Sequence, residues 1–402
     1  MGNTAPESTV PRGAPGVAGG RLRRPGGHAG KGRARLGLIV NPVAGMGGRV
    51  GLKGTDGAEI VRRARSLGAT PVAAGRAARA LARLDRYHDR VSVVAGARAM
   101  GADLARAHGL ATELVAAGDG DETTAEDTKA AAAEMERRSV ELILFAGGDG
   151  TTRDIVDAVG TAVPILGIPT GVKMHSGVFA TSPEAAGDLV ASHLCGTAKH
   201  LRDSEVMDVD EDALRAGRVS ARLHAVARVP FDRVRVQNPK AASAAPDAAL
   251  DALCRQMAAE ASGDRLTLLG PGTTTHRILR HLELDGTLLG VDAVASGRLV
   301  GADLNEAQLL ELLDGRPATL VVAVVGGQGY VFGRGNQQLS PEVIRRVGLD
   351  NVEIVASLDK VLALDPPGLR VDTGDPALDA ELAGYRAVRV APNRSLVLKV
   401  ST

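Results

Sequence analysis

The stretch that most restricts the fold is residues 141–154, ELILFAGGDGTTRD, where an apolar run ends in a glycine-rich turn. Residues 142–146 predict a buried strand, because a short apolar run bounded by turn residues is typical of strands in parallel sheets. The residues after the turn are compatible with a helix. A strand, a glycine turn and a helix in this order are typical of phosphate sites in α/β proteins. We therefore expect an α/β fold with an anion site at this turn.

The turn combines three glycines with one carboxylate. Gly147, Gly148 and Gly150 let the backbone take positive φ and approach an oxyanion closely. Asp149 would be repelled by phosphates unless it holds a metal ion or accepts a proton from the group being phosphorylated. Both are roles in phosphoryl transfer. The alternative is a plain glycine turn in which Asp149 only caps the helix.

Composition narrows the class of protein. A length of 402 residues predicts two or three domains, and no apolar run approaches the ~20 residues of a membrane helix. Cys195 and Cys254 are far apart and lack a CxxC partner, which predicts a reducing compartment, the cytoplasm. Trp is absent and there are only four Phe and three Tyr, which argues against stacking on nucleic acid. We expect a soluble protein with no nucleic-acid partner and no stable membrane association.

The N-terminus differs from the rest of the chain in charge. Residues 1–36 contain seven Lys or Arg and one Glu, although the whole chain has a net charge of only +1. This segment is rich in Gly, Pro and Arg and has no apolar core of a secretory signal, so residues 1–35 are predicted to be a disordered basic tail. A transit peptide is the alternative.

Residues 36–198 alternate short apolar runs with alanine-rich stretches, which predicts a Rossmann-like, doubly wound domain. Its strands are expected at residues 36–40, 71–74, 91–95, 112–116, 142–146 and 164–168. Glycine-rich segments follow three of them, at residues 41–48, 147–151 and 167–177. Because ligands in such sheets bind at the carboxyl ends of strands, we expect these segments to converge on one crevice.

The remaining chain is predicted to be richer in strands. Residues 199–345 are expected to form a β-rich, substrate-binding domain, and residues 346–402 a C-terminal segment that packs back and completes the fold. The strands are expected at residues 205–209, 218–229, 233–236, 289–294, 298–300, 319–325, 353–356, 369–371, 387–390 and 396–400. Helices are expected at residues 246–262 and 275–282.

Several of these motifs resemble a known superfamily. GGDGT at 147–151, followed by the strand and glycine loop at 166–171, resembles the superfamily of NAD kinases, diacylglycerol and sphingosine kinases and phosphofructokinases. More narrowly, the chain is similar to the predicted ATP- or polyphosphate-dependent NAD kinase family over roughly residues 36–394. The motifs that carry this resemblance are NPVAGMGGRVGLKGTDG (41–57), GIPTGVKMHSGVFATSP (167–183), GPGTTT (270–275), GGQGYVFGRGNQQLSPEVI (326–344) and VDTGD (371–375).

The resemblance implies a fold and an activity. It implies a Rossmann-like first domain, a β-sandwich-like second domain, and phosphoryl transfer from ATP or polyphosphate to the 2′-hydroxyl of NAD with a divalent metal, usually Mg²⁺. NAD and ATP would be the small-molecule partners, and homo-oligomers are typical of the family. The alternatives are a kinase of the same fold acting on a lipid or another small hydroxylated metabolite, and a non-catalytic nucleotide sensor.

The resemblance also implies site residues. Asp149 would contact the acceptor hydroxyl or the metal, and the backbone of Gly147, Gly148, Gly150 and Thr151 would line the phosphate path. The residues themselves offer further candidates, which are polar or glycine residues in loops, and plain turns or helix caps are the alternative for them. They are Asn41, Gly45, Gly47, Gly48, Gly171, Lys173, His175 and Ser176 around the first turn, Gly270, Gly272, Thr273, Thr274 and Thr275 as a second phosphate cradle, and Asn336, Asp372 and Asp375 near the C-terminus.

The sequence around the Asn-Glu pair differs from that of the family. Well-studied NAD kinases hold the nucleoside of NAD with an Asn-Glu pair, and here Asn305-Glu306 stands in ADLNEAQLLELL. That context predicts a helix start in which Asn305 caps and Glu306 favours the helix dipole. The dinucleotide contacts are therefore expected to come from other residues.

Overall fold

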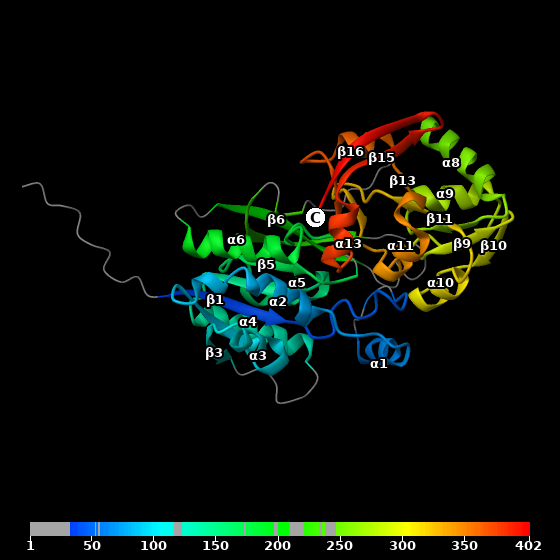
Figure 1. Ribbon diagram of the computed structural model, residues 1–402. Helices are drawn as coiled ribbons and strands as arrows, with labels where there is room; N and C mark the ends of the chain where they lie inside the picture. Colours follow the sequence, from blue (N-terminus) through cyan, green and yellow to red (C-terminus); the bar gives the residue numbers. More distant parts are fainter. Residues whose placement is uncertain are drawn as a thin grey trace, which may run out of the picture. The chain divides into compact units, whose positions relative to one another are not determined.

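The first part of the chain folds into a five-stranded sheet in the computed structural model (Figure 1). The strands are β1 (Ala34–Val40), β2 (Val91–Gly96), β3 (Ala111–Val115), β4 (Leu142–Gly147) and β5 (Ile165–Pro169), in the order β3-β2-β1-β4-β5. All neighbouring pairs are parallel, and every residue of β4 is buried. A central parallel strand is covered on both faces, which explains its continuous apolar sequence. The predicted doubly wound arrangement is confirmed.

The structure describes residues 33–52, 54, 57–115, 123–172, 174–196, 200–209, 221–232, 235–237 and 247–402. The basic tail predicted for residues 1–35 therefore lies outside the described residues as far as residue 32. No helix in the described ranges is long and apolar enough to cross a membrane.

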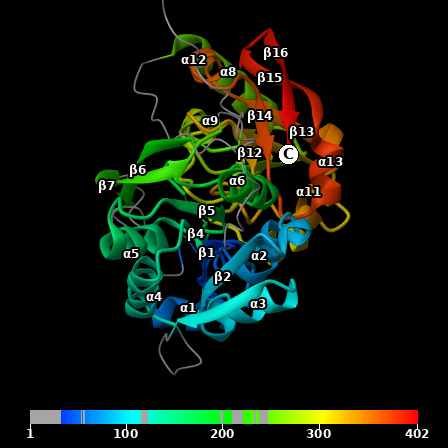
Figure 2. The ribbon, with the colours of Figure 1, turned by 90° about the vertical axis from the view of Figure 1, so that its left-hand side faces the viewer.

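Helices cover both faces of the first sheet. They are α2 (Ala73–Ala82), α3 (Ala102–Ala107), α4 (Ala125–Arg137), α5 (Asp149–Val159) and α6 (Pro183–Cys195), with short 3-10 turns η1 (Asp85–Tyr87) and η2 (Arg98–Met100). A further helix, α1 (Ala58–Ser66), lies apart from this sheet, and its buried residues Val61 and Ala64 are not part of the same core (Figure 1). Figure 2 shows α4 and α5 on one side of the strands and α2 and α3 on the other.

The strand predicted at residues 71–74 is wrong, because α2 begins at Ala73. Only Val72 in that segment favours a strand. Buried Ala73, Ala77 and Ala80 recur at near-helical spacing, and burying this face of α2 against α6 and the first sheet outweighs the local preference.

A two-stranded hairpin follows the first sheet. It consists of β6 (Leu201–Val209) and β7 (Ala221–Pro230). Val206, Ala227 and Val229 are buried in the same hydrophobic core as the first sheet. The strand predicted at 233–236 is reduced to one isolated bridge between Ala180 and Val236, and residues 233 and 234 lie outside the described residues.

The second sheet contains nine strands of mixed direction. They are β8 (Leu266–Leu269), β9 (Asp292–Ala295), β10 (Arg298–Gly301), β11 (Ala318–Ala323), β12 (Tyr330–Phe332), β13 (Val352–Val355), β14 (Leu369–Val371), β15 (Gly384–Ala391) and β16 (Arg394–Ser401). The order is β10-β9-β8-β11-β13-β15-β16-β14-β12, so the C-terminal strands join the same sheet as β8 and β11. This confirms that the end of the chain packs back, and with it the predicted α/β class with a β-rich second part.

Both faces of the second sheet are apolar. Leu268 and Val322 belong to one core with α10 (Glu306–Leu312), α11 (Pro341–Val347), α12 (Leu358–Leu362) and α13 (Pro376–Leu382). Leu269 and Val321, one residue along each strand, belong to another core with α8 (Ala248–Ala261) and α9 (Thr273–His281). Neighbouring residues of a strand point to opposite faces, which explains why these strands have continuous apolar sequence. A 3-10 turn, η3 (Leu349–Asn351), precedes β13.

Candidate functional site

The three glycine-rich segments after β1, β4 and β5 meet at the carboxyl ends of these strands. The side-chain amide of Asn41 donates to Thr151 Oγ1 at 3.0 Å, and the Gly171 amide donates to the Gly147 carbonyl at 3.2 Å. Gly45 has a φ of 76°, and a Cβ there would overlap the carbonyl of Thr170. The three segments therefore contact one another, as predicted, although residues 147–151 are not among those that line the pocket described below.

Asp149 clamps the loop that follows β5. Its Oδ2 accepts the His175 amide at 2.7 Å, and its Oδ1 accepts the Ser176 amide at 3.0 Å. His175 Nδ1 lies 3.4 Å from Asp149 Oδ2. The Asp149 side chain is 11% exposed. Because a carboxylate has about four acceptor positions, Asp149 can hold this loop and still accept a further proton or ligate a cation.

Gly147 and Gly148 are required by close packing and not, as expected, by a positive φ. Gly148 is the N-cap of α5, and Asp149 is its first residue. A Cβ on Gly147 would lie 2.5 Å from Thr151 Cβ, and one on Gly148 would lie 3.3 Å from Gly171 Cα. Side chains at these two positions would therefore push the turn away from its own helix and from the neighbouring loop.

The loop at residues 174–176 is also held from the other side. Ser176 Oγ accepts the Met207 amide at 2.9 Å, and the Ser176 carbonyl accepts Gln237 Nε2 at 3.1 Å. The Met174 carbonyl accepts Gln328 Nε2 at 3.0 Å. Segments that are distant in the sequence thus position the groups around Asp149. Lys173, a predicted phosphate ligand in this loop, lies outside the described residues.

A pocket of about 320 Å³ adjoins this loop at Gly171. Its charged wall includes four arginines, Arg49, Arg76, Arg79 and Arg334, and one carboxylate, Asp372. Five glycines also line it, at positions 45, 75, 171, 333 and 374. The combination offers cationic groups and exposed backbone to a ligand. Such surroundings suit phosphate groups.

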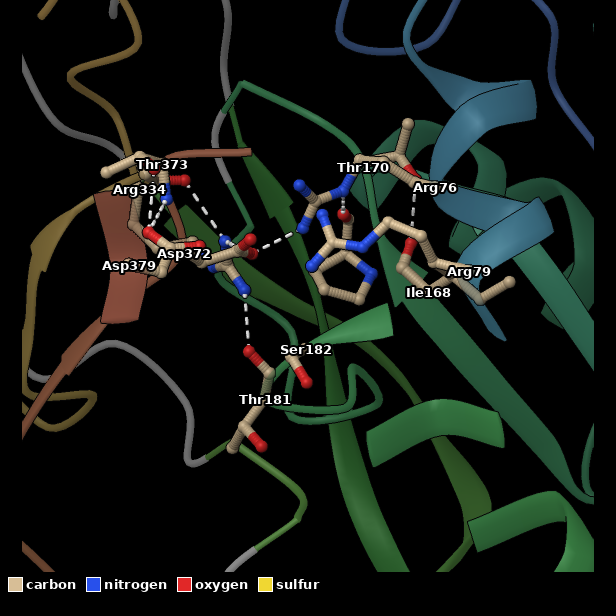
Figure 3. Close-up of polar contacts among 12 residues, drawn as sticks. Arg76, Arg79, Ile168, Thr170, Thr181, Ser182, Arg334, Asp372, Thr373 and Asp379 are labelled. Carbon is tan, nitrogen blue, oxygen red and sulfur yellow. Dashed lines mark hydrogen bonds and ion pairs between the residues drawn. The ribbon is translucent and has the colours of Figure 1, made fainter. Parts of the chain in front are cut away.

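Asp372 is the centre of a buried ion-pair cluster in the pocket wall (Figure 3). Its Oδ2 accepts Arg334 Nη1 at 2.7 Å and also pairs with Arg76 of α2. Burial alone would raise the pKa of Asp372, but the ion pairs with Arg76 and Arg334 outweigh burial and lower the pKa to about 2. Arg334 also lies over the ring of Tyr330, 4.2 Å from the centroid. Asp372 is therefore ionised at neutral pH and orients both arginines.

Two other C-terminal candidates make structural contacts. Asp375 caps α13 by accepting the amides of Ala377 and Leu378, and it pairs with Arg345 at 2.7 Å. The Asn336 side chain is buried and bridges the Gly333 amide and the Val331 carbonyl. Asn336 therefore shapes the loop that carries Arg334.

The predicted second phosphate cradle, residues 270–275, forms the turn between β8 and α9. Thr275 Oγ1 donates to the Gly272 carbonyl at 3.0 Å, and Thr274 and Thr275 are buried. Thr273 is the first residue of α9, and Gly270 lies beside Leu339. None of residues 270–275 is among the lining residues of the arginine-rich pocket.

The remaining candidates lie in two loops. Gly47 and Gly48 lie in the loop after β1, where a Cβ on Gly48 would lie 2.9 Å from Gln337 Cβ. Asn305 caps α10 through a reciprocal pair with Gln308, which confirms the predicted capping role. The Glu306 amide donates to the Arg49 carbonyl, so this helix start contacts the same loop.

The described residues contain no group of three or more His, Cys, Asp or Glu side chains that could hold a metal ion. A single carboxylate such as Asp149 is sufficient for a Mg²⁺ ion that arrives with phosphates. Mg²⁺ commonly takes one or two protein carboxylates and completes its shell with phosphate and water.

Sequence reasoning missed Arg76, Arg79 and Arg334. Arg76 and Arg79 stand in the alanine-rich sequence of α2, where arginines usually form a solvated face. Arg334 could have been identified as a candidate from the sequence, because an arginine between two glycines fits neither the apolar pattern of a core nor the periodic pattern of a helix face.

Comparisons with known proteins agree with this geometry. The model of the ATP-NAD kinase N-terminal domain matches residues 36–197, and that of the ATP-NAD kinase C-terminal domain matches residues 264–400. No curated protein matches the chain. The first match includes the glycine turn with Asp149, the second includes Asp372 and its arginine partner Arg334, and together they span most of the sequence. The chain therefore belongs to the NAD kinase family.

Proposed function

We propose that this kinase transfers a phosphoryl group from ATP or polyphosphate to the 2′-hydroxyl of NAD and so makes NADP. The observation that carries the proposal is the position of Asp149. It is held at the junction of three glycine loops in a chain of the NAD kinase family. The arginine-rich pocket beside Gly171 supports a phosphorylated ligand in this region.

Phosphoryl transfer requires that the two substrates are positioned and that the charge on the transferred group is stabilised. The acceptor oxygen forms a bond to the terminal phosphorus of the donor, and the bond from that phosphorus to the leaving oxygen breaks, which releases ADP or a shortened polyphosphate. Asp149 takes the proton of the acceptor hydroxyl. The amides of the glycine turn stabilise charge on the phosphoryl oxygens, which is the main protein contribution in such reactions. The alternative role of Asp149 is to hold a Mg²⁺ ion, which would neutralise phosphate charge when bound.

The test is direct. Purified protein is incubated with NAD, Mg²⁺ and either ATP or polyphosphate, and NADP is followed with an NADP-specific dehydrogenase. We expect NADP with at least one donor, and its loss in Asp149→Asn. Asp157→Asn is the matched control, because Asp157 is on the same helix but pairs with His224 at 2.8 Å.

Absence of NADP with both donors from folded protein would contradict the proposal. A screen of other hydroxyl compounds, including lipids in vesicles, would then identify the acceptor. Binding of NAD or ATP without any turnover would favour a nucleotide sensor.

A further inference from the structure

The pocket beside Gly171 carries more positive than negative side chains. Four arginines line it, against Asp372 as the one acidic residue among its lining residues. Two carboxylates outside this lining also pair with these arginines. Arg79 makes a bidentate pair with Glu184, and Arg49 approaches Glu306. Among the residues that the structure describes, four arginines therefore face three carboxylates, which leaves a positive surplus at the wall of the pocket.

The arginines differ in how firmly they are held. Arg334 is 4% exposed and donates to Asp372, Tyr330 and two carbonyls. Arg76 is 13% exposed and bonds Asp372 and the carbonyl of Pro169. Arg49, by contrast, is 50% exposed and lies 3.9 Å from Glu306. Arg49 is thus the guanidinium most available to an incoming anion, with Arg76 fixed across the same pocket.

Three buried polar atoms in the pocket wall lack partners among the described residues, and one of them is Gln337 Oε1. Asp372 Oδ1 and Arg334 Nε have no hydrogen-bond partner within the described chain, although both side chains are more than nine-tenths buried. An unpaired buried polar group destabilises the structure that contains it. A ligand that brings a hydroxyl donor for the carboxylate oxygen would remove part of this destabilisation. The pocket wall therefore contains polar atoms whose hydrogen bonds a ligand could complete.

The size and lining of the pocket restrict the ligand. A volume of about 320 Å³ is at the lower end of small-molecule sites, enough for part of a nucleotide. Glycines at positions 45, 171 and 374 let backbone groups approach phosphate oxygens closely. Arginines recognise phosphates through paired N–H donors.

We propose that this pocket binds the diphosphate of a nucleotide, with Arg49 and Arg76 on the phosphates and Asp372 accepting a hydrogen bond from a neighbouring ribose hydroxyl. The inference deepens the proposed function and rests on it only for the identity of the nucleotide. Diphosphate chemistry is shared by NAD and by the phosphate chain of ATP. Asp372 would then serve the ribose in place of the Asn-Glu pair, whose Asn305 caps α10.

Calorimetric titration of the full chain tests this without turnover. The probes are inorganic pyrophosphate, ADP and 2′,3′-dideoxy-ADP, followed by NAD and ATP. The variant is Arg49→Gln. The matched control is Arg83→Gln, which removes the same charge from an arginine that pairs with Asp188 at 2.8 Å and does not line the pocket.

We expect Arg49→Gln to weaken pyrophosphate and ADP binding by about tenfold, since a charge-assisted hydrogen bond is lost, and Arg83→Gln to change neither. In the native protein, 2′,3′-dideoxy-ADP should bind about tenfold more weakly than ADP, because Asp372 loses its hydroxyl donor. A selective loss of NAD affinity in Arg49→Gln would assign the pocket to the acceptor, and a selective loss of ATP affinity would assign it to the donor.

If Arg49→Gln binds pyrophosphate and ADP as tightly as the native protein does, the phosphate assignment is overturned. If the native protein binds ADP and its dideoxy analogue with equal affinity, the role of Asp372 is overturned. The outcome is separable from the proposed activity. Binding that depends on Arg49 can hold in a protein that forms no NADP, and NADP can form in a protein whose binding ignores Arg49.

Discussion

Two glycine turns of this chain have similar local sequences and different surroundings. One joins β4 to α5 and contains Asp149, and the other joins β8 to α9 and contains Thr275. Asp149 bonds the amides of His175 and Ser176, 26 and 27 residues away in the chain. Thr275 bonds the carbonyl of Gly272 within its own turn. A strand, glycine turn and helix therefore make a candidate site only when other loops pack against them.

The largest expected effect comes from exchanging the polar group of each turn. Asp149→Asn should lower kcat by about 10²–10⁴-fold, because the proton acceptor is lost. It should also cost about 1–3 kcal/mol of unfolding free energy, because an amide loses its acceptor. Thr275→Val should cost about 1 kcal/mol and leave kcat within about twofold. The rate of NADP formation measures kcat, and urea unfolding measures the free energy of unfolding. A large loss of kcat in Thr275→Val would contradict the proposed difference between the two turns.

Alanine substitutions compare the packing of the same two turns. Gly147→Ala places a Cβ 2.5 Å from Thr151 Cβ, whereas Gly270→Ala meets Val321 O at 3.4 Å, an ordinary contact. We expect the first to lower the free energy of unfolding by about 1–3 kcal/mol and the second to change it by less than about 1 kcal/mol. Chemical denaturation of both proteins gives the comparison, and equal losses would contradict it.

The pH dependence of stability tests the ion pairs beside the first turn. The pKa of Asp372 is lowered to about 2, so its stabilisation is present above pH ~4 and is lost as the pH falls toward 2. The stability difference between native protein and Asp372→Asn should therefore shrink by about 2 kcal/mol over that range. Urea unfolding from pH 6 downward measures it. Asp379→Asn is the control, because burial raises the pKa of Asp379 and gives the opposite trend.

The smallest effect concerns a helix start in the second part of the chain. Asn305→Ala should remove the cap of α10 and cost about 1 kcal/mol of unfolding free energy, with no change in the KM for NAD. Thermal unfolding measures the loss of stability, and steady-state kinetics measure the KM for NAD. A rise in KM would show that Asn305 contacts the dinucleotide after all.

Much of the fold could be predicted from local pattern. Buried strands such as β4 and β11 are continuous apolar runs, and α8 and α9 have helical patterns, so their positions follow from sequence. The start of α2 was predicted incorrectly, because one valine before an alanine run favours a strand locally and only packing against α6 selects the helix. The capping role of Asn305 was predictable, since a cap involves neighbours three residues apart.

The α/β class, the glycine turn around Asp149 and the family resemblance could all be predicted from the sequence, because each rests on residues close together in the chain. The loops that face Asp149, and the buried cluster of Arg76, Arg334 and Asp372, could be seen only in the folded structure. Arg76 and Asp372 are 296 residues apart. Their pairing depends on how α2 and the end of β14 are brought together, which no local preference of the chain encodes.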